Sequence, residues 1–298
     1  MAHATAMTEV MEATERHLFF PSQGLRVLGV LHTPARPARE GALVFLHGWA
    51  GYRIGPHQMF TKLARRAAAA GFHCLRFDFR GRGDSEGDAQ AATLATMIED
   101  ALAAVAMICE ESGVQRVALI GDCSGSEVAI GAGVLDGRID SLVLWSAPIV
   151  GGDRREAEAA KRRGIYGSYL RKLVRRETWA KLVGGRLQPG MILRVLRAGG
   201  RGAGEEGAAS DREIDWRRRY VDFAGEVLHI YGGNDPTTHS ALEHYRELAR
   251  DAGREFHRYV VEGANHAFYS LGWENEVMDV SLQWLCERYR PVADHGRQ

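Results

Sequence analysis

Two kinds of segment alternate along this chain of 298 residues. Short runs rich in β-branched and other apolar residues are followed by longer runs whose apolar residues have helical spacing. Such alternation predicts an α/β protein, with a mostly parallel sheet and helices on both of its faces. The predicted strands of this pattern are 42–46, 73–78, 116–121, 141–146, 226–231 and 256–261, and the predicted helices are 56–70, 93–111, 124–135, 240–252 and 274–289.

Two extended segments, 16–20 and 25–33, precede this pattern and have no long helix between them. We expect them to form an antiparallel edge of the same sheet, which then has eight strands. Segment 148–222 breaks the alternation, because it shows no strand signal and consists of Arg-rich helical pieces interrupted by Gly and Pro. The predicted organisation is a core in two parts, 1–147 and 223–298, with a helical cap or lid at 148–222 inserted after the sixth strand.

Charges balance over the whole chain but not within the predicted lid. Lys and Arg together number 38, and so do Asp and Glu. This balance argues against a nucleic-acid partner, which proteins usually attract with a net positive field. Segment 148–222, in contrast, contains 18 Lys or Arg against 10 Asp or Glu. A basic segment of this kind fits a phosphate-bearing or acidic partner, or it is a solvated helical face.

The sequence favours a cytoplasmic protein that does not interact with a membrane. Residues 1–16 lack the apolar stretch of a signal peptide, and no run of 18 uncharged apolar residues occurs. The four cysteines lie far apart without C-x-x-C spacing, so we expect reduced thiols and no metal site. The oligomeric state stays open, because the outer strands of such a sheet can support a dimer.

Segment 116–130 has the pattern of a strand, a tight turn and a helix, with Cys123 at the turn. Gly121 and Gly125 lie two residues before it and two residues after it. A nucleophile at such a turn has strained backbone angles, and the flanking positions must be small because the strand and the helix nearly touch. Cys123 is therefore the predicted nucleophile, activated by the helix N-terminus and by a neighbouring imidazole.

Two other interpretations of this turn remain open. If Ser124 were the nucleophile, Asp122 and Ser126 would occupy the crowded positions, where an Asp carboxylate fits poorly. Alternatively, Cys123 is a buried structural cysteine that precedes Ser124 at a helix N-cap.

Two strand ends downstream carry the groups that a cysteine nucleophile needs. Asp235 follows the predicted strand 226–231 in a glycine turn, and His266 follows the last predicted strand. In the order nucleophile, acid, histidine, His266 would act as the general base and Asp235 would orient its imidazole. The competing choices are His239 as base and Glu262 or Asp222 as acid.

A glycine turn directly after the predicted strand 42–46 can present backbone N–H groups to a negatively charged oxygen. We expect the N–H groups of Trp49 and Ser124 to form an oxyanion hole. His47 and Gly48 are expected to line the substrate site, and the side chain of His47 would also brace the loop.

On these residues the chain resembles the α/β-hydrolase superfamily, and within it the feruloyl esterase-like and serine aminopeptidase-like members. The resemblance rests on segments 46–51 and 75–87, on the turn around Cys123 and on the two downstream strand ends. It implies the α/β-hydrolase fold and a structural role for the block 77–85 beside the active site. These relatives usually carry Ser at the turn, whereas dienelactone hydrolase is similar in using Cys in a G-x-C-x-G motif.

The function predicted from these residues is cleavage of a carboxylic ester or thioester through an S-acyl-cysteine intermediate, without a metal or organic cofactor. A thioester intermediate also permits acyl transfer to an amine, alcohol or thiol acceptor in biosynthesis, and this is the alternative activity. In that case the basic segment 148–222 suits an acyl donor bound to CoA or to a carrier protein. A non-catalytic binding protein on the same fold is the third possibility.

Overall fold

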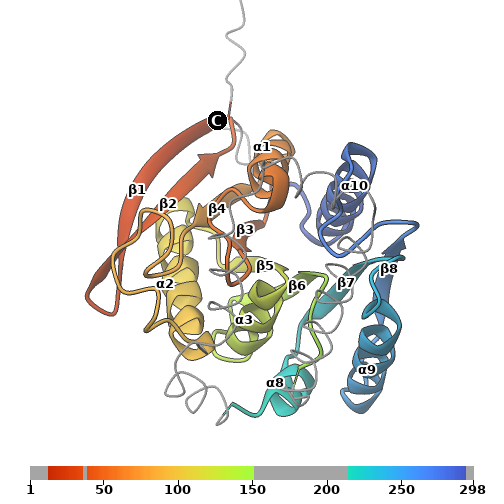
Figure 1. Ribbon diagram of the computed structural model, residues 1–298. Helices are drawn as coiled ribbons and strands as arrows, with labels where there is room; N and C mark the ends of the chain where they lie inside the picture. The colour runs from red at the N-terminus through yellow and green to blue at the C-terminus, as the bar shows by residue number, and fades with distance from the viewer. Residues whose placement is uncertain (1–12, 36–38, 151–213, 293–298) are drawn as a thin grey trace, which may run out of the picture.

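A computed structural model describes residues 13–35, 39–150 and 214–292. These residues contain one eight-stranded sheet with the spatial order β1-β2-β4-β3-β5-β6-β7-β8 (Figure 1). β1 pairs antiparallel with β2, and β2 pairs antiparallel with β4, whereas the other neighbouring pairs are parallel. The strands are β1 (Thr14–Ser22), β2 (Leu25–Thr33), β3 (Gly41–Leu46), β4 (His73–Phe77), β5 (Arg116–Asp122), β6 (Ile139–Trp145), β7 (Glu226–Gly232) and β8 (His257–Val261).

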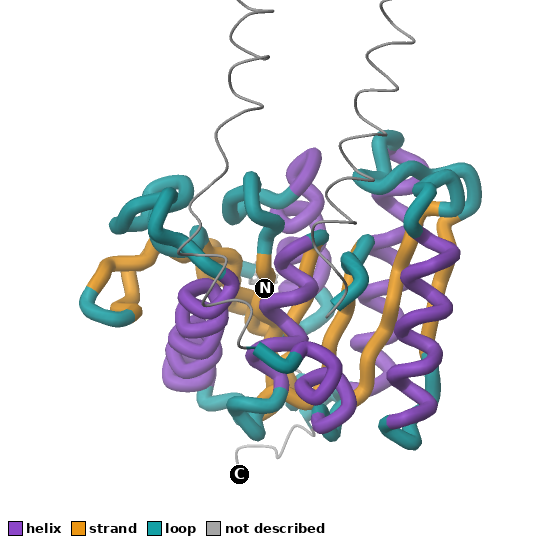
Figure 2. The backbone as a smooth tube through the Cα atoms, turned by 60° about the horizontal axis from the view of Figure 1, so that its bottom comes forward, coloured by secondary structure: helices purple, strands orange, loops and turns teal. Residues whose placement is uncertain are grey.

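Helices cover both faces of this sheet. α1 and α10 pack against one face, and α2, α3, α8 and α9 pack against the other (Figure 1). Figure 2 shows the strands side by side in orange, with the purple helices running along them and the connecting loops in teal at their ends. The helices are η1 (Pro56–Gln58), α1 (Met59–Ala69), α2 (Leu94–Ser112), α3 (Ser124–Gly133), α8 (Trp216–Asp222), α9 (Thr238–Asp251) and α10 (Leu271–Arg288).

Each face of the sheet buries its own hydrophobic cluster, because successive side chains of a strand point to opposite faces. In β3, Ala42, Val44 and Leu46 belong to the cluster under α2 and α3. Leu43 and Phe45, which alternate with them, belong to the cluster under α1 and α10. A central strand that is apolar on both faces is typical of a parallel sheet buried between two helical layers.

The fold class expected from the sequence is confirmed, and each predicted strand and helix of the core is present within a few residues of its expected bounds. Most of the predicted cap at 148–222 lies outside the described residues. Its described end forms α8, whose Trp216 and Tyr220 are buried in the same cluster as α3. This short helix therefore packs on the core.

All four cysteines lie in the described ranges and are free thiols, with Cys74 and Cys109 buried and Cys123 and Cys286 partly exposed. Among the helices of residues 13–35, 39–150 and 214–292, none is both long and apolar enough to cross a membrane.

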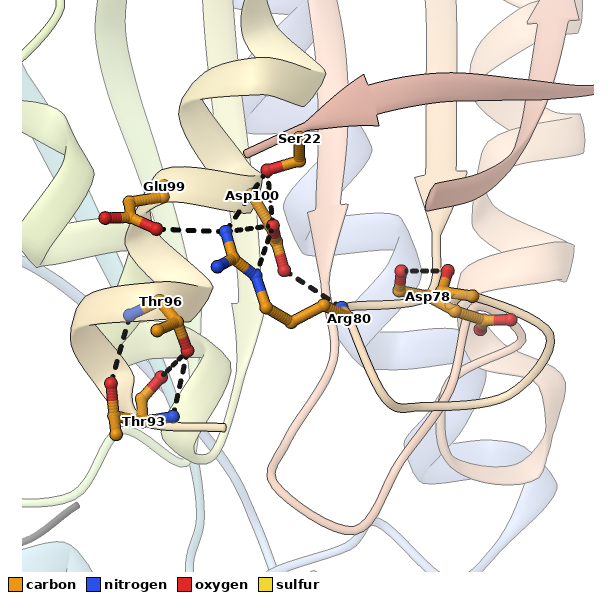
Figure 3. A network of polar contacts seen from close by, with 8 residues as sticks. Ser22, Asp78, Arg80, Thr93, Thr96, Glu99 and Asp100 are labelled. Atoms are coloured by element: carbon orange, nitrogen blue, oxygen red, sulfur yellow. Dashed lines mark hydrogen bonds and ion pairs between the residues drawn. The ribbon is translucent and has the colours of Figure 1, made fainter. Parts of the chain in front are cut away.

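The loop after β4 is anchored to α2 through Arg80 (Figure 3). Nε and Nη2 of Arg80 donate to Oδ1 of Asp100 at 2.9 and 2.7 Å, and the Arg80 backbone N–H donates to Oδ2 at 2.9 Å. Ser22 Oγ at the end of β1 donates to the same carboxylate at 2.5 Å. Because Asp100 is fully buried, these donors compensate a charge that water cannot reach. The network gives the block 77–85 a structural role.

Candidate active site

The predicted site residues follow the carboxyl ends of β3, β5, β7 and β8. β3 and β5 are neighbours in the sheet, but the chain leaves them toward opposite sides, to β4 and to β6. The crevice at such a topological switch point is where open parallel sheets bind their ligands. A Cβ atom built on Gly48, just after β3, would lie 3.5 Å from Cβ of Cys123, just after β5. The two loops are thus in contact at the switch point.

Cys123 occupies a strained turn between β5 and α3. Its backbone angles are φ 52° and ψ −119°, which non-glycine residues rarely adopt. A Cβ on Gly125 would lie 2.0 Å from the carbonyl oxygen of Leu46, and one on Gly121 would lie 2.6 Å from the backbone of Gly125. Glycine is therefore required on both sides of Cys123 because β3, β5 and α3 approach one another so closely. The spacing in the sequence predicts this crowding.

Asp235 and His266 are joined by a short hydrogen bond. His266 Nδ1 lies 2.6 Å from Oδ2 of Asp235, whose side chain is only 3% exposed. Burial alone would raise the pKa of Asp235, but hydrogen bonds from His266 and Thr237 outweigh it and lower that pKa. The ionised carboxylate therefore fixes the imidazole with its proton on Nδ1 and directs Nε2 away from the acid.

The Cys123 side chain also influences the charge of His266. Hydrogen bonding to Asp235 is the largest cause that raises the pKa of His266 to about 10, and interaction with the Cys123 side chain is the second. Nε2 is buried, and it makes no hydrogen bond of standard geometry with the described residues. Catalytic hydrogen bonds are often poorly aligned before substrate binds.

Three side chains that the sequence analysis missed hold this pair in place. Thr237 donates to Oδ1 of Asp235 from its backbone N–H at 3.0 Å and from Oγ1 at 2.9 Å. Ser146, at the end of β6, donates from Oγ to the backbone carbonyl of His266 at 2.8 Å. Asn265 Oδ1 accepts from two backbone N–H groups that follow His266. An Asp-x-Thr turn is a recognisable signal for Thr237, whereas the Ser146 contact joins segments 120 residues apart and has no local signal.

The predicted oxyanion loop follows β3. The His47 ring is buried, its Nδ1 lies 2.8 Å from the carbonyl oxygen of Gly48, and its Nε2 accepts from the N–H of Phe79 at 3.3 Å. Burial lowers the pKa of His47 to about 4, so the ring is neutral. Its contacts with the backbone of Gly48 and Phe79 support the loop. Only backbone atoms of His47 and Gly48 are thus left to line a substrate site. The N–H of Trp49 donates to Oγ of Ser124 at 2.6 Å.

A buried carboxylate ties this loop to the next one. Asp78, fully buried after β4, accepts from the backbone N–H of Arg53 at 2.6 Å and from that of Asp84 at 3.0 Å. The Arg53 guanidinium also pairs with this carboxylate. The loops after β3 and β4 therefore form one unit beside Cys123.

The competing residues lie in less suitable environments. The His239 side chain is 87% exposed and pairs with Glu243 on its own helix. Asp222 is exposed on α8 and contacts Arg218 at 3.2 Å, and Glu262 is exposed after β8. None of these three carries a hydrogen bond to His266 or Asp235 among the described contacts.

Asp122 adds a second carboxyl group to the crevice. A Cβ on Gly48 would lie 3.6 Å from its Oδ2, so this carboxyl group lies beside the oxyanion loop. Burial raises the pKa of Asp122 to about 6, although the charge of His266 opposes the shift. A group whose pKa is higher in the folded than in the unfolded chain contributes stability at low pH, and that stability is lost as the pH rises through about 6.

The variant Asp122→Asn is therefore expected to be more stable than the wild type at pH 8, by about 1–3 kcal/mol, and to lose this advantage toward pH 4. Thermal unfolding of both proteins between pH 4 and pH 8 measures the difference. A gap in Tm that stays constant over this range would contradict the assignment.

A family model described as "Alpha/beta hydrolase family" matches residues 43–275, which include every residue of the site described above. Curated relatives match over shorter segments. Human "Protein ABHD12B" is 36% identical over 106 residues, which is 34% of this chain and 28% of that protein. "Lysophosphatidylserine lipase ABHD12" of Danio rerio is 31% identical over 137 residues, or 40% of this chain and 34% of the relative. The matched segment thus spans about a third of these relatives.

Solved structures match over most of the chain. Dienelactone hydrolase from Anabaena variabilis superposes with a TM-score of 0.60 and 13% identity, covering 94% of this chain and 99% of that one. Est1E from Butyrivibrio proteoclasticus with bound ferulic acid gives a TM-score of 0.63 and 16% identity, covering 91% of this chain and 98% of the other. At these identities the likeness shows the fold.

Proposed function

Because the chain belongs to the alpha/beta hydrolase family, we propose that it cleaves a carboxylic ester or thioester with Cys123 as nucleophile, His266 as acid and base, and Asp235 as the group that orients the imidazole. The observation that carries this proposal is the hydrogen bond of 2.6 Å between His266 and the buried Asp235, and the effect of the Cys123 side chain on the pKa of His266 supports it. A lipase among the relatives supports a carboxylic ester as substrate.

Before attack, Cys123 transfers its proton to Nε2 of His266, whose raised pKa favours a thiolate–imidazolium pair. In the first half of the reaction, the thiolate attacks the carbonyl carbon. A carbon–sulfur bond forms, and the carbonyl oxygen becomes an oxyanion at the N-terminus of α3, where backbone N–H groups stabilise it. The bond to the alcohol or thiol then breaks, and His266 returns the proton to the departing oxygen or sulfur.

In the second half, His266 takes a proton from water, and the resulting hydroxide attacks the S-acyl carbon. The carbon–sulfur bond breaks, the carboxylic acid is released, and the proton that stays on His266 restores the thiolate–imidazolium pair. An amine, alcohol or thiol in place of water would give acyl transfer. The His266–Asp235 pair serves either acceptor.

Intact-protein and peptide mass spectrometry after exposure to acyl esters and acyl thioesters tests the proposal. We expect an acyl adduct on Cys123 of the wild type and no adduct in the variant Cys123→Ala. The variant Cys286→Ala is the matched control, since Cys286 is the other partly exposed thiol and lies on α10. An adduct on Ser124, or product formation by Cys123→Ala at the wild-type rate, would refute the cysteine mechanism.

The same reactions with added amines and alcohols separate hydrolysis from transfer. Free carboxylic acid alone indicates hydrolysis, whereas conjugates that appear in proportion to the acceptor indicate transfer. A wild type that forms neither adduct nor product across the panel would favour a binding protein.

A further inference from the structure

The hydroxyl of Ser124 is hydrogen-bonded to the loop after β3 that is predicted to bind the oxyanion. The N–H of Trp49, predicted to donate directly to the oxyanion, donates instead to Oγ of Ser124 at 2.6 Å. Trp49 follows β3 and Ser124 begins α3, so this bond spans the crevice beside Cys123. An N–H group in a bond this short is not free for a second strong acceptor.

Ser124 itself still has two donors available at the same point. Its backbone N–H belongs to the first turn of α3, where N–H groups have no partner within the helix. Its hydroxyl accepts from Trp49, and the hydroxyl hydrogen has no acceptor among the described residues. A backbone N–H and a hydroxyl from one residue at a helix N-terminus are suited to a single anionic oxygen.

We propose that the Ser124 hydroxyl is a direct donor of the oxyanion hole and that the Trp49 N–H acts through it. This inference rests on the proposed function. The oxyanion receives hydrogen bonds from the N–H and the Oγ–H of Ser124, while the Trp49 N–H holds Oγ in position. A hydroxyl that accepts one hydrogen bond becomes a stronger donor, because the bonds of a chain polarise one another.

A competing arrangement makes the opposite prediction. If the hydroxyl only blocked the hole in the absence of substrate, it would rotate away on binding and free the Trp49 N–H for the oxyanion. Removal of the hydroxyl would then leave the reaction as fast or make it faster. In the arrangement proposed here, removal deletes a donor at the charge that develops in the transition state.

The variant Ser124→Ala is therefore expected to lower kcat for a good ester substrate about 10- to 100-fold. The lower end applies if the released Trp49 N–H partly replaces the lost donor. Ser124→Thr keeps the hydroxyl, so it should recover most of the kcat that Ser124→Ala loses. A kcat for Ser124→Ala equal to or above that of the wild type would overturn the proposal.

Two reagents distinguish loss of the donor from damage to the turn. A trifluoromethyl ketone captures the thiol as an anionic tetrahedral adduct, so its affinity should fall at least about tenfold in Ser124→Ala. Iodoacetamide alkylates the thiol without forming an oxyanion, and its rate at Cys123 should stay within about twofold. If both reactions weaken equally, the hydroxyl supports the turn and the proposal is wrong. If the wild type reacts with neither reagent at Cys123, the proposed function fails and this inference fails with it.

Discussion

The variant Asp235→Asn should retain the fold and lose most of the activity, with kcat lowered about 10³- to 10⁴-fold. The two oxygens of the Asp235 carboxylate have different hydrogen-bond partners. Oδ1 accepts from the backbone N–H and hydroxyl of Thr237, and Oδ2 lies 2.6 Å from Nδ1 of His266. The Thr237 donors hold the amide oxygen of Asn at the first position, so the amide NH₂ group faces the imidazole.

The substitution of Asp235 by Asn changes the tautomer of the His266 imidazole. An NH₂ group donates to Nδ1, which must then carry the lone pair, so the ring proton moves to Nε2 and faces Cys123. A ring in this tautomer does not accept the thiol proton. The pKa of His266 should also fall from its value of about 10, because the hydrogen bond to Asp235 is the largest cause of its increase.

Steady-state kinetics over pH 5–10 test both effects. We expect a lower kcat throughout and an alkaline limb displaced to lower pH. Asp222→Asn and Glu262→Gln serve as controls, because both remove an exposed carboxylate, one from the end of α8 before β7 and one directly after β8, and should leave kcat within about twofold. A loss smaller than tenfold in Asp235→Asn, or an equal loss in a control, would remove Asp235 from the site.

The sequence predicts the core of this molecule well because its elements are specified locally. Strand β3 is apolar on both faces over six residues, and the turn at Cys123 requires Gly121 and Gly125 at fixed spacing. Asp235 and His266 are each found from the strand that they follow. Short-range patterns of this kind are readable without knowledge of the packing.

What the sequence does not predict depends on long-range contacts. The bond from Ser146 to the His266 backbone and that from Trp49 to the Ser124 hydroxyl each join distant segments through a single pair of atoms. Neither has a periodicity or a motif. The sequence predicts two roles for His47, one as a residue that lines the substrate site and one as a brace of the loop. Burial of the ring and its two contacts with backbone atoms show that the side chain supports the loop.

The largest effect on stability is expected from Asp100→Ala, which should lower the free energy of unfolding by about 3–5 kcal/mol. The Asp100 carboxylate is fully buried and accepts from Arg80 and Ser22 (Figure 3). Its removal leaves the Arg80 guanidinium, only 12% exposed, with Glu99 as its remaining charged partner. The Arg80 guanidinium would still be held away from water, and the attraction to Asp100 that compensates its desolvation cost would be lost.

Glu99→Ala provides a control on the same guanidinium. Glu99 contacts Arg80 Nη2 at 3.0 Å, but its side chain is 44% exposed, so its removal should cost less than about 1 kcal/mol. Urea unfolding at neutral pH measures the loss of unfolding free energy in both variants. A similar loss in the two would mean that burial of the Asp100 carboxylate does not determine the cost of removing it.

The double variant Arg80→Met with Asp100→Ala should be more stable than Asp100→Ala alone, because it removes the unpaired cation together with its partner. Since Arg80 anchors the loop after β4, which Asp78 ties to the oxyanion loop, Asp100→Ala should also lower kcat at temperatures where the protein is still folded.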